Sequence, residues 1–115
     1  MLGPMSSETL SMRVMGWSNG QPLPTGAGYG VRLSDRDRDD YFDPGWHEVV
    51  VALDQGETAF VSLSESFWRS CPELRSAAIG RWLLRHHLAP WPRGLPPELV
   101  LRHMVGNRFE LRTPQ

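Results

Sequence analysis

The side chains with the clearest binding chemistry in this sequence are its arginines. All twelve basic residues are arginine and none is lysine. A binding role would explain this preference, and the base composition of the genome explains it equally well. The guanidinium group makes forked, bidentate contacts to phosphate and carboxylate. Residues 1–65 hold four arginines against ten acidic residues (−6), whereas residues 66–115 hold eight against three (+5). This asymmetry predicts either a basic surface for an acidic partner or two halves that neutralise each other.

We expect a non-catalytic binding module, with nucleic acid (DNA) as the first candidate partner. Trp91 lies between two prolines, and we expect it to stack on a base or wedge between bases, unless its loop simply packs over one end of the fold. The alternative is a protein–protein interaction domain that uses the Trp91 loop and an exposed strand edge. The candidate phosphate contacts are six arginines of the second half: Arg69, Arg75, Arg81, Arg85, Arg93 and Arg102.

Catalytic and metal chemistry have weaker candidates. Cys71 is the only thiol, and a lone cysteine is more often a small buried hydrophobe than a nucleophile. His86 and His87 are adjacent, whereas metal-binding pairs on a helix are three or four residues apart. Aspartates alternate with arginines over residues 35–43, which is typical of a self-paired surface turn. The glycine-rich residues 26–30 lead into a strand, not into the helix that a phosphate loop needs. We therefore expect no metal, no cofactor and, on balance, no enzyme.

Length and composition favour one small globular domain. The chain has 115 residues, 40% hydrophobic and 22% charged, with 11 glycines and 10 prolines. We expect a single domain over residues 10–112, preceded by a frayed terminus at residues 1–9. Apolar runs are too short to span a membrane, and no basic segment followed by an apolar run suggests a secretory signal. The single cysteine fits a reducing, cytoplasmic compartment.

Alternating apolar residues predict strands near residues 10–17, 29–33, 46–53, 58–63, 99–104 and 108–112. Ser34 and Asp37 resemble a capping box that opens a helical turn over residues 35–42. Ser70, Pro72 and Glu73 predict the start of one main helix, at about 70–87, with Arg81 and Arg85 on one exposed face. The sequence thus predicts an α+β fold: a small, mainly antiparallel, partly closed β-barrel of five or six strands with that helix packed against it.

The last two strands form a hairpin whose loop length decides which residues are buried. A two-residue turn would place Arg102 beside Leu111. A three-residue loop at residues 105–107 instead gathers the apolar residues Leu99, Leu101, Phe109 and Leu111 on one face. Burial favours the three-residue loop, with glycine or asparagine in the left-handed conformation.

The second half of the sequence holds a series of short motifs: Ser66-Phe67-Trp68, Cys71-Pro72-Glu73-Leu74-Arg75, Ile79-Gly80-Arg81-Trp82-Leu83, Pro90-Trp91-Pro92 with Gly94 and Pro96-Pro97, and Asn107-Arg108-Phe109-Glu110-Leu111. Together they resemble a family of small bacterial proteins to which we attach no activity. The resemblance covers roughly residues 28–112. At the level of layout alone, the strands, helix and closing hairpin are also similar to DNA-binding pseudobarrels, including the recognition domains of some restriction endonucleases. No base-contacting residue of that group can be matched here, so none is carried over.

Overall fold

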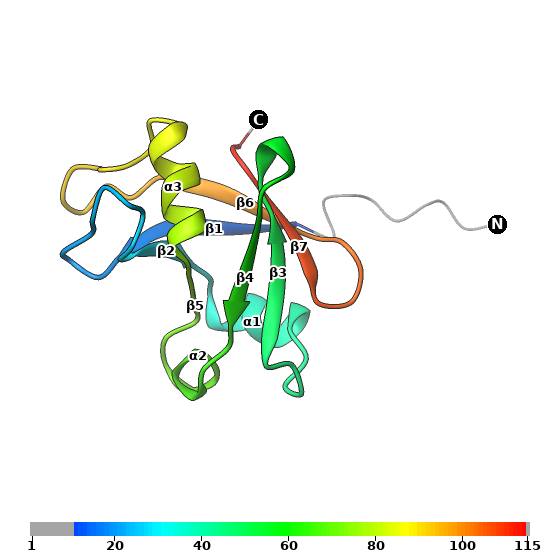
Figure 1. The fold of residues 1–115 in the computed structure, drawn as a ribbon. Helices are drawn as coiled ribbons and strands as arrows, with labels where there is room; N and C mark the ends of the chain where they lie inside the picture. The colour runs from blue at the N-terminus through cyan, green and yellow to red at the C-terminus, as the bar shows by residue number, and fades with distance from the viewer. Residues whose placement is uncertain (1–10, 115) are drawn as a thin grey trace.

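A single sheet, nearly closed into a barrel, dominates the computed structural model, which describes residues 11–114 (Figure 1). Its seven strands lie in the order β4-β3-β7-β6-β1-β2-β5. Neighbouring strands are antiparallel except for β3 and β7, which are parallel. The predicted α+β fold with a small barrel is confirmed, with seven strands where five or six were expected. The strands are β1 (Ser11–Ser18), β2 (Tyr29–Arg32), β3 (Glu48–Ala52), β4 (Thr58–Ser62), β5 (Glu73–Arg75), β6 (Glu98–His103) and β7 (Arg108–Arg112).

Short helices lie at the two ends of the barrel (Figure 1). α1 (Asp35–Tyr41) and α2 (Glu65–Arg69) lie at one end, and α3 (Ala77–Arg85) lies at the other. A single 3-10 turn, η2 (Asp54–Gly56), connects β3 to β4. The Ser34 hydroxyl accepts the Asp37 amide proton, as the predicted cap of α1 requires.

The main helix is shorter than its predicted range of about 70–87. Ser70 lies directly after α2, and Leu74 pairs with Val31 as part of β5. Ser76, not Ser70, caps α3, because its hydroxyl accepts from the amides of residues 78 and 79. Pro72 and Glu73, which resemble the start of a helix, therefore lead into strand β5. This short strand explains part of the difference between the seven strands found and the five or six expected.

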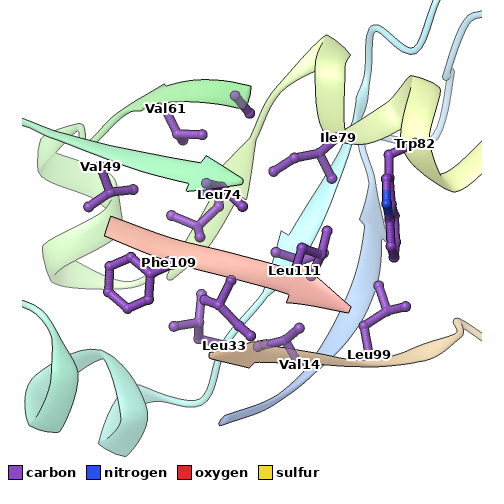
Figure 2. Close-up of a cluster of buried hydrophobic side chains, with 14 of the residues drawn as sticks. Val14, Leu33, Val49, Val61, Leu74, Ile79, Trp82, Leu99, Phe109 and Leu111 are labelled. Carbon is purple, nitrogen blue, oxygen red and sulfur yellow. The ribbon is translucent and has the colours of Figure 1, made fainter. Parts of the chain in front are cut away.

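The core fills the barrel as strand alternation predicts. Met12 and Val14 on β1 are buried whereas Arg13 and Met15 are exposed. Strand β3 lies between β4 and β7, an internal position that suits a strand with two apolar faces. Figure 2 shows Ile79 and Trp82 of α3 directed toward the strands that carry Leu99 and Leu111.

The closing hairpin has the three-residue loop. Leu101 pairs with Leu111, and His103 pairs with Phe109. Gly106 adopts the left-handed conformation at φ 56°, which glycine tolerates without strain. The three-residue loop that burial of the apolar residues predicts is confirmed.

The predicted frayed terminus at residues 1–9 lies outside the described residues. Over residues 11–114, no helix is long and apolar enough to cross a membrane.

Candidate nucleic-acid interface

Arg81 and Arg85 share one exposed face of α3, as predicted, but the β3–β4 turn neutralises them. The Arg85 guanidinium lies 2.7 Å from Glu57 and 3.3 Å from Asp54. The Arg81 guanidinium lies 3.6 Å from Glu57 and donates to the Thr25 carbonyl at 3.4 Å. Here the charges of the acidic half and of the basic half of the sequence do neutralise each other.

His86 completes this network at the end of α3. Its Nε2 lies 2.5 Å from Asp54 Oδ2, and its ring lies 4.5 Å from the Trp82 ring. The hydrogen bond from His86 and the contacts with Arg85 hold the pKa of Asp54 below its ordinary value. A pocket of about 240 Å³ lies beside these residues and extends to Glu110 and to residues 111–113.

Arg75 stacks on an aromatic ring across a glycine. The ladder places Trp17, Gly30 and Arg75 side by side on β1, β2 and β5. Since Gly30 has no side chain, the guanidinium carbon reaches 4.7 Å from the centroid of the Trp17 ring. Glu73, whose side chain is 5% exposed, binds Arg75 at 2.7 Å and lies 3.9 Å from Arg32.

A second carboxylate is shared in the same way between two arginines. Glu110 on β7 lies 3.7 Å from Arg102 and 3.9 Å from Arg112. Arg13 on β1 pairs with Glu98 on β6 at 2.9 Å. These side chains occupy neighbouring outward positions, because residue 100 of β6 pairs with both Arg13 and Arg112.

The outward side of β6, β1, β2 and β5, together with Glu110 and Arg112 of β7, therefore carries a continuous basic surface, which we call the basic face. It holds five arginines and three glutamates, an excess of two positive charges on a chain whose net charge is −1. Only two of the six arginines proposed from the sequence belong to it. Its charged residues are Arg13, Arg32, Arg75, Arg102 and Arg112 with Glu73, Glu98 and Glu110.

The other sequence-predicted residues lie elsewhere. Arg69 ends α2 and Arg93 lies in the proline-rich loop; both are exposed, and neither makes an ion pair with residues 11–114. The half-buried Trp91 ring lies 5.6 Å from the Tyr29 ring, over Gly16. The loop thus packs on the barrel, which was the alternative to a free stacking residue.

Neither a metal centre nor a thiol-based active site is assembled in the part of the chain that the structure describes. No group of three or more histidine, cysteine or acidic side chains is placed to hold a metal ion there. The Cys71 sulfur lies 3.6 Å from the Ser70 hydroxyl, and no histidine hydrogen-bonds to it among residues 11–114.

Comparison with family models, curated proteins and solved structures finds no match for this chain. The resemblance to small bacterial proteins and the likeness to DNA-binding pseudobarrels therefore stay predictions.

Proposed function

We propose that this protein is a non-catalytic module that binds nucleic acid through the basic face. The observation that carries the proposal is the excess of arginine over glutamate across five adjacent strands. Strand order brings Arg13 and Arg32 from the acidic half of the sequence beside Arg75 and Arg102 from the basic half. The single cysteine favours a reducing, cytoplasmic setting for this module.

The glutamates orient the arginines without using up their donors. Each guanidinium has five N–H groups, and Glu73 and Glu110 each serve two arginines. The remaining donors of Arg32, Arg75 and Arg112 are accessible, because these side chains are about half exposed, at 56, 52 and 51%. Phosphate oxygens are the ligands that such forked donors bind best.

The face also offers apolar surface beside the charges. Met15 is 37% exposed, and the half-buried Trp17 ring is held by Arg75. Contacts to phosphate position a protein on nucleic acid but carry no sequence information. We therefore expect binding with little sequence preference, supported by sugar and base contacts at Met15 and Trp17.

The excess charge sets the expected salt dependence. Two excess charges correspond to neutralisation of about two phosphates, for which duplex DNA predicts a log–log salt slope of about −1.8. Raising the salt concentration from about 20 mM to about 200 mM should then weaken binding about 60-fold. A partner without negative charges would not show this salt dependence.

Fluorescence anisotropy with labelled single- and double-stranded DNA and RNA tests the proposal. The test variant is Arg13→Ala/Arg75→Ala/Arg112→Ala, which leaves one arginine on each of the shared glutamates. We expect it to bind at least about tenfold more weakly than wild type at about 20 mM salt.

The matched control is Arg36→Ala/Arg69→Ala/Arg93→Ala. It removes the same charge from exposed positions outside the basic face, and we expect close to wild-type affinity. If the wild type does not bind any of the four probes at low salt, the proposal is wrong. Equal losses in the two triple variants would also contradict it, because binding would then follow net charge alone.

A further inference from the structure

An exposed, mainly apolar row crosses three strands beside the basic face and ends at Met104, directly after β6. The ladder places Phe60, Val50 and Arg108 side by side on β4, β3 and β7. Met104 continues the row, since its amide donates to the Arg108 carbonyl at 2.9 Å. Phe60 is 67% exposed, Met104 47% and Val105 70%. Together these residues form an outward apolar patch on a sheet whose order ends at β4.

Two opposite charges in or beside this row have no ion-pair partner among residues 11–114. Arg108 makes no ion pair with residues 11–114, although nine of the twelve arginines do. Glu48, two residues before Val50 on the same side of β3, likewise makes none within the described chain. A surface that holds one free cation and one free anion beside apolar groups is complementary to itself.

We propose that the apolar row, made of Val50, Phe60, Met104 and Val105 with Glu48 and Arg108, is an interface between two copies of this chain. A twofold axis parallel to the strands, between β3 and β7, reverses the order of the row. It sets Phe60 of each copy against Met104 of the other, a favourable sulfur–aromatic contact. Outward faces of two sheets pack about 10 Å apart, within the reach of an arginine to a glutamate of the second copy.

The electrostatics of the whole chain favour this occupant. The net charge of −1 gives little repulsion between copies. An isologous contact forms two Arg108–Glu48 pairs at once, so both unpaired charges gain a partner. The basic face lies beside this row: it shares β7 with the row through Glu110 and Arg112 and continues over β6, β1, β2 and β5. The dimer does not depend on nucleic-acid binding.

Sedimentation velocity between about 1 and about 200 µM tests the proposal. We expect a monomer–dimer equilibrium that Phe60→Ser weakens at least about tenfold, by the loss of a buried aromatic anchor. The matched control is Leu95→Ser, whose side chain is equally exposed at 67% but lies in the loop before β6. It should dimerise like wild type.

Charge exchange supplies an independent readout. Glu48→Arg and Arg108→Glu should each weaken the dimer about tenfold, and the double variant should restore it to within about threefold. Far-UV circular dichroism checks that each variant is folded. A monomer at every concentration, or a dimer insensitive to Phe60→Ser, would overturn the proposal. A dimer that forms only after removal of residues 1–10 would also overturn it, since the chain itself would then cover the row.

Discussion

Replacing Gly80 by alanine tests how closely α3 packs on the loop between β1 and β2. A Cβ on Gly80 would lie 2.0 Å from the Gly26 carbonyl oxygen and 2.7 Å from the Gly26 carbonyl carbon and Cα. Non-bonded heavy atoms are normally about 3.5–4.0 Å apart. The helix and the loop would therefore have to separate by more than about 1 Å, and the loop is further fixed by the Arg81 bond to Thr25.

Two opposing terms decide the sign of the effect. Alanine in place of glycine inside a helix stabilises by about 1 kcal/mol. Overpacking costs about 1–3 kcal/mol and occasionally more. All three atoms that the new Cβ would meet belong to the Gly26 backbone, which cannot rotate away as a side chain would. We expect the clash to prevail, with a net loss of about 2 kcal/mol in the free energy of unfolding.

Urea denaturation followed by tryptophan fluorescence and far-UV circular dichroism measures this loss. Gly45→Ala is the matched control, because its Cβ would meet only the Asp43 side-chain oxygen, at 3.3 Å. We expect the control to stay within about 0.5 kcal/mol of wild type. A Gly80→Ala protein as stable as wild type, or more so, would refute the close packing of α3 on the loop.

Two other predictions concern residues near the candidate site. The hydrogen bond from His86 and the charge of Arg85 lower the Asp54 pKa from its ordinary value of 3.8, so the folded state favours the ionised carboxylate. This stabilisation is present above pH 3.8 and is lost as the pH falls through the lower, folded-state pKa. Asp54→Asn should therefore flatten the acid-side fall in thermal midpoint between about pH 2 and pH 6, and an unchanged profile would refute this role. Trp91→Ala should lower the free energy of unfolding by about 2 kcal/mol, since the half-buried ring packs on Tyr29, and urea denaturation would show no change if the ring were free.

Local sequence patterns predicted most of the fold. Alternation identified six of the strands, and burial chose the three-residue loop around Gly106. The error lies at residues 70–76, where Pro72 and Glu73 match a helix start. Leu74 is fully buried beside Val31 in the sheet, and this tertiary pairing overrides the local cap signal. A three-residue strand is too short to show a period in the sequence.

The candidate site depended on contacts between distant residues, so only part of it was predictable. Charge sums over the two halves pointed to Arg81 and Arg85, which in the fold meet Asp54 and Glu57. The outward position of Arg13 on β1 was readable from alternation. Its place beside β6 follows from strand order, which no local pattern specifies. The same is true of the stack of Arg75 on a ring two strands away.

Chemical-shift mapping on the isotope-labelled protein tests the central claim most directly. A short DNA duplex is added at about 20 mM salt, where electrostatic binding is strongest. We expect shifts of the arginine Nε–H signals of the basic face and of the backbone amides of β1, β2, β5 and β6. We also expect these shifts to vanish at about 200 mM salt. No shifts at low salt, or shifts confined to α3 and the loop at residues 90–97, would contradict it.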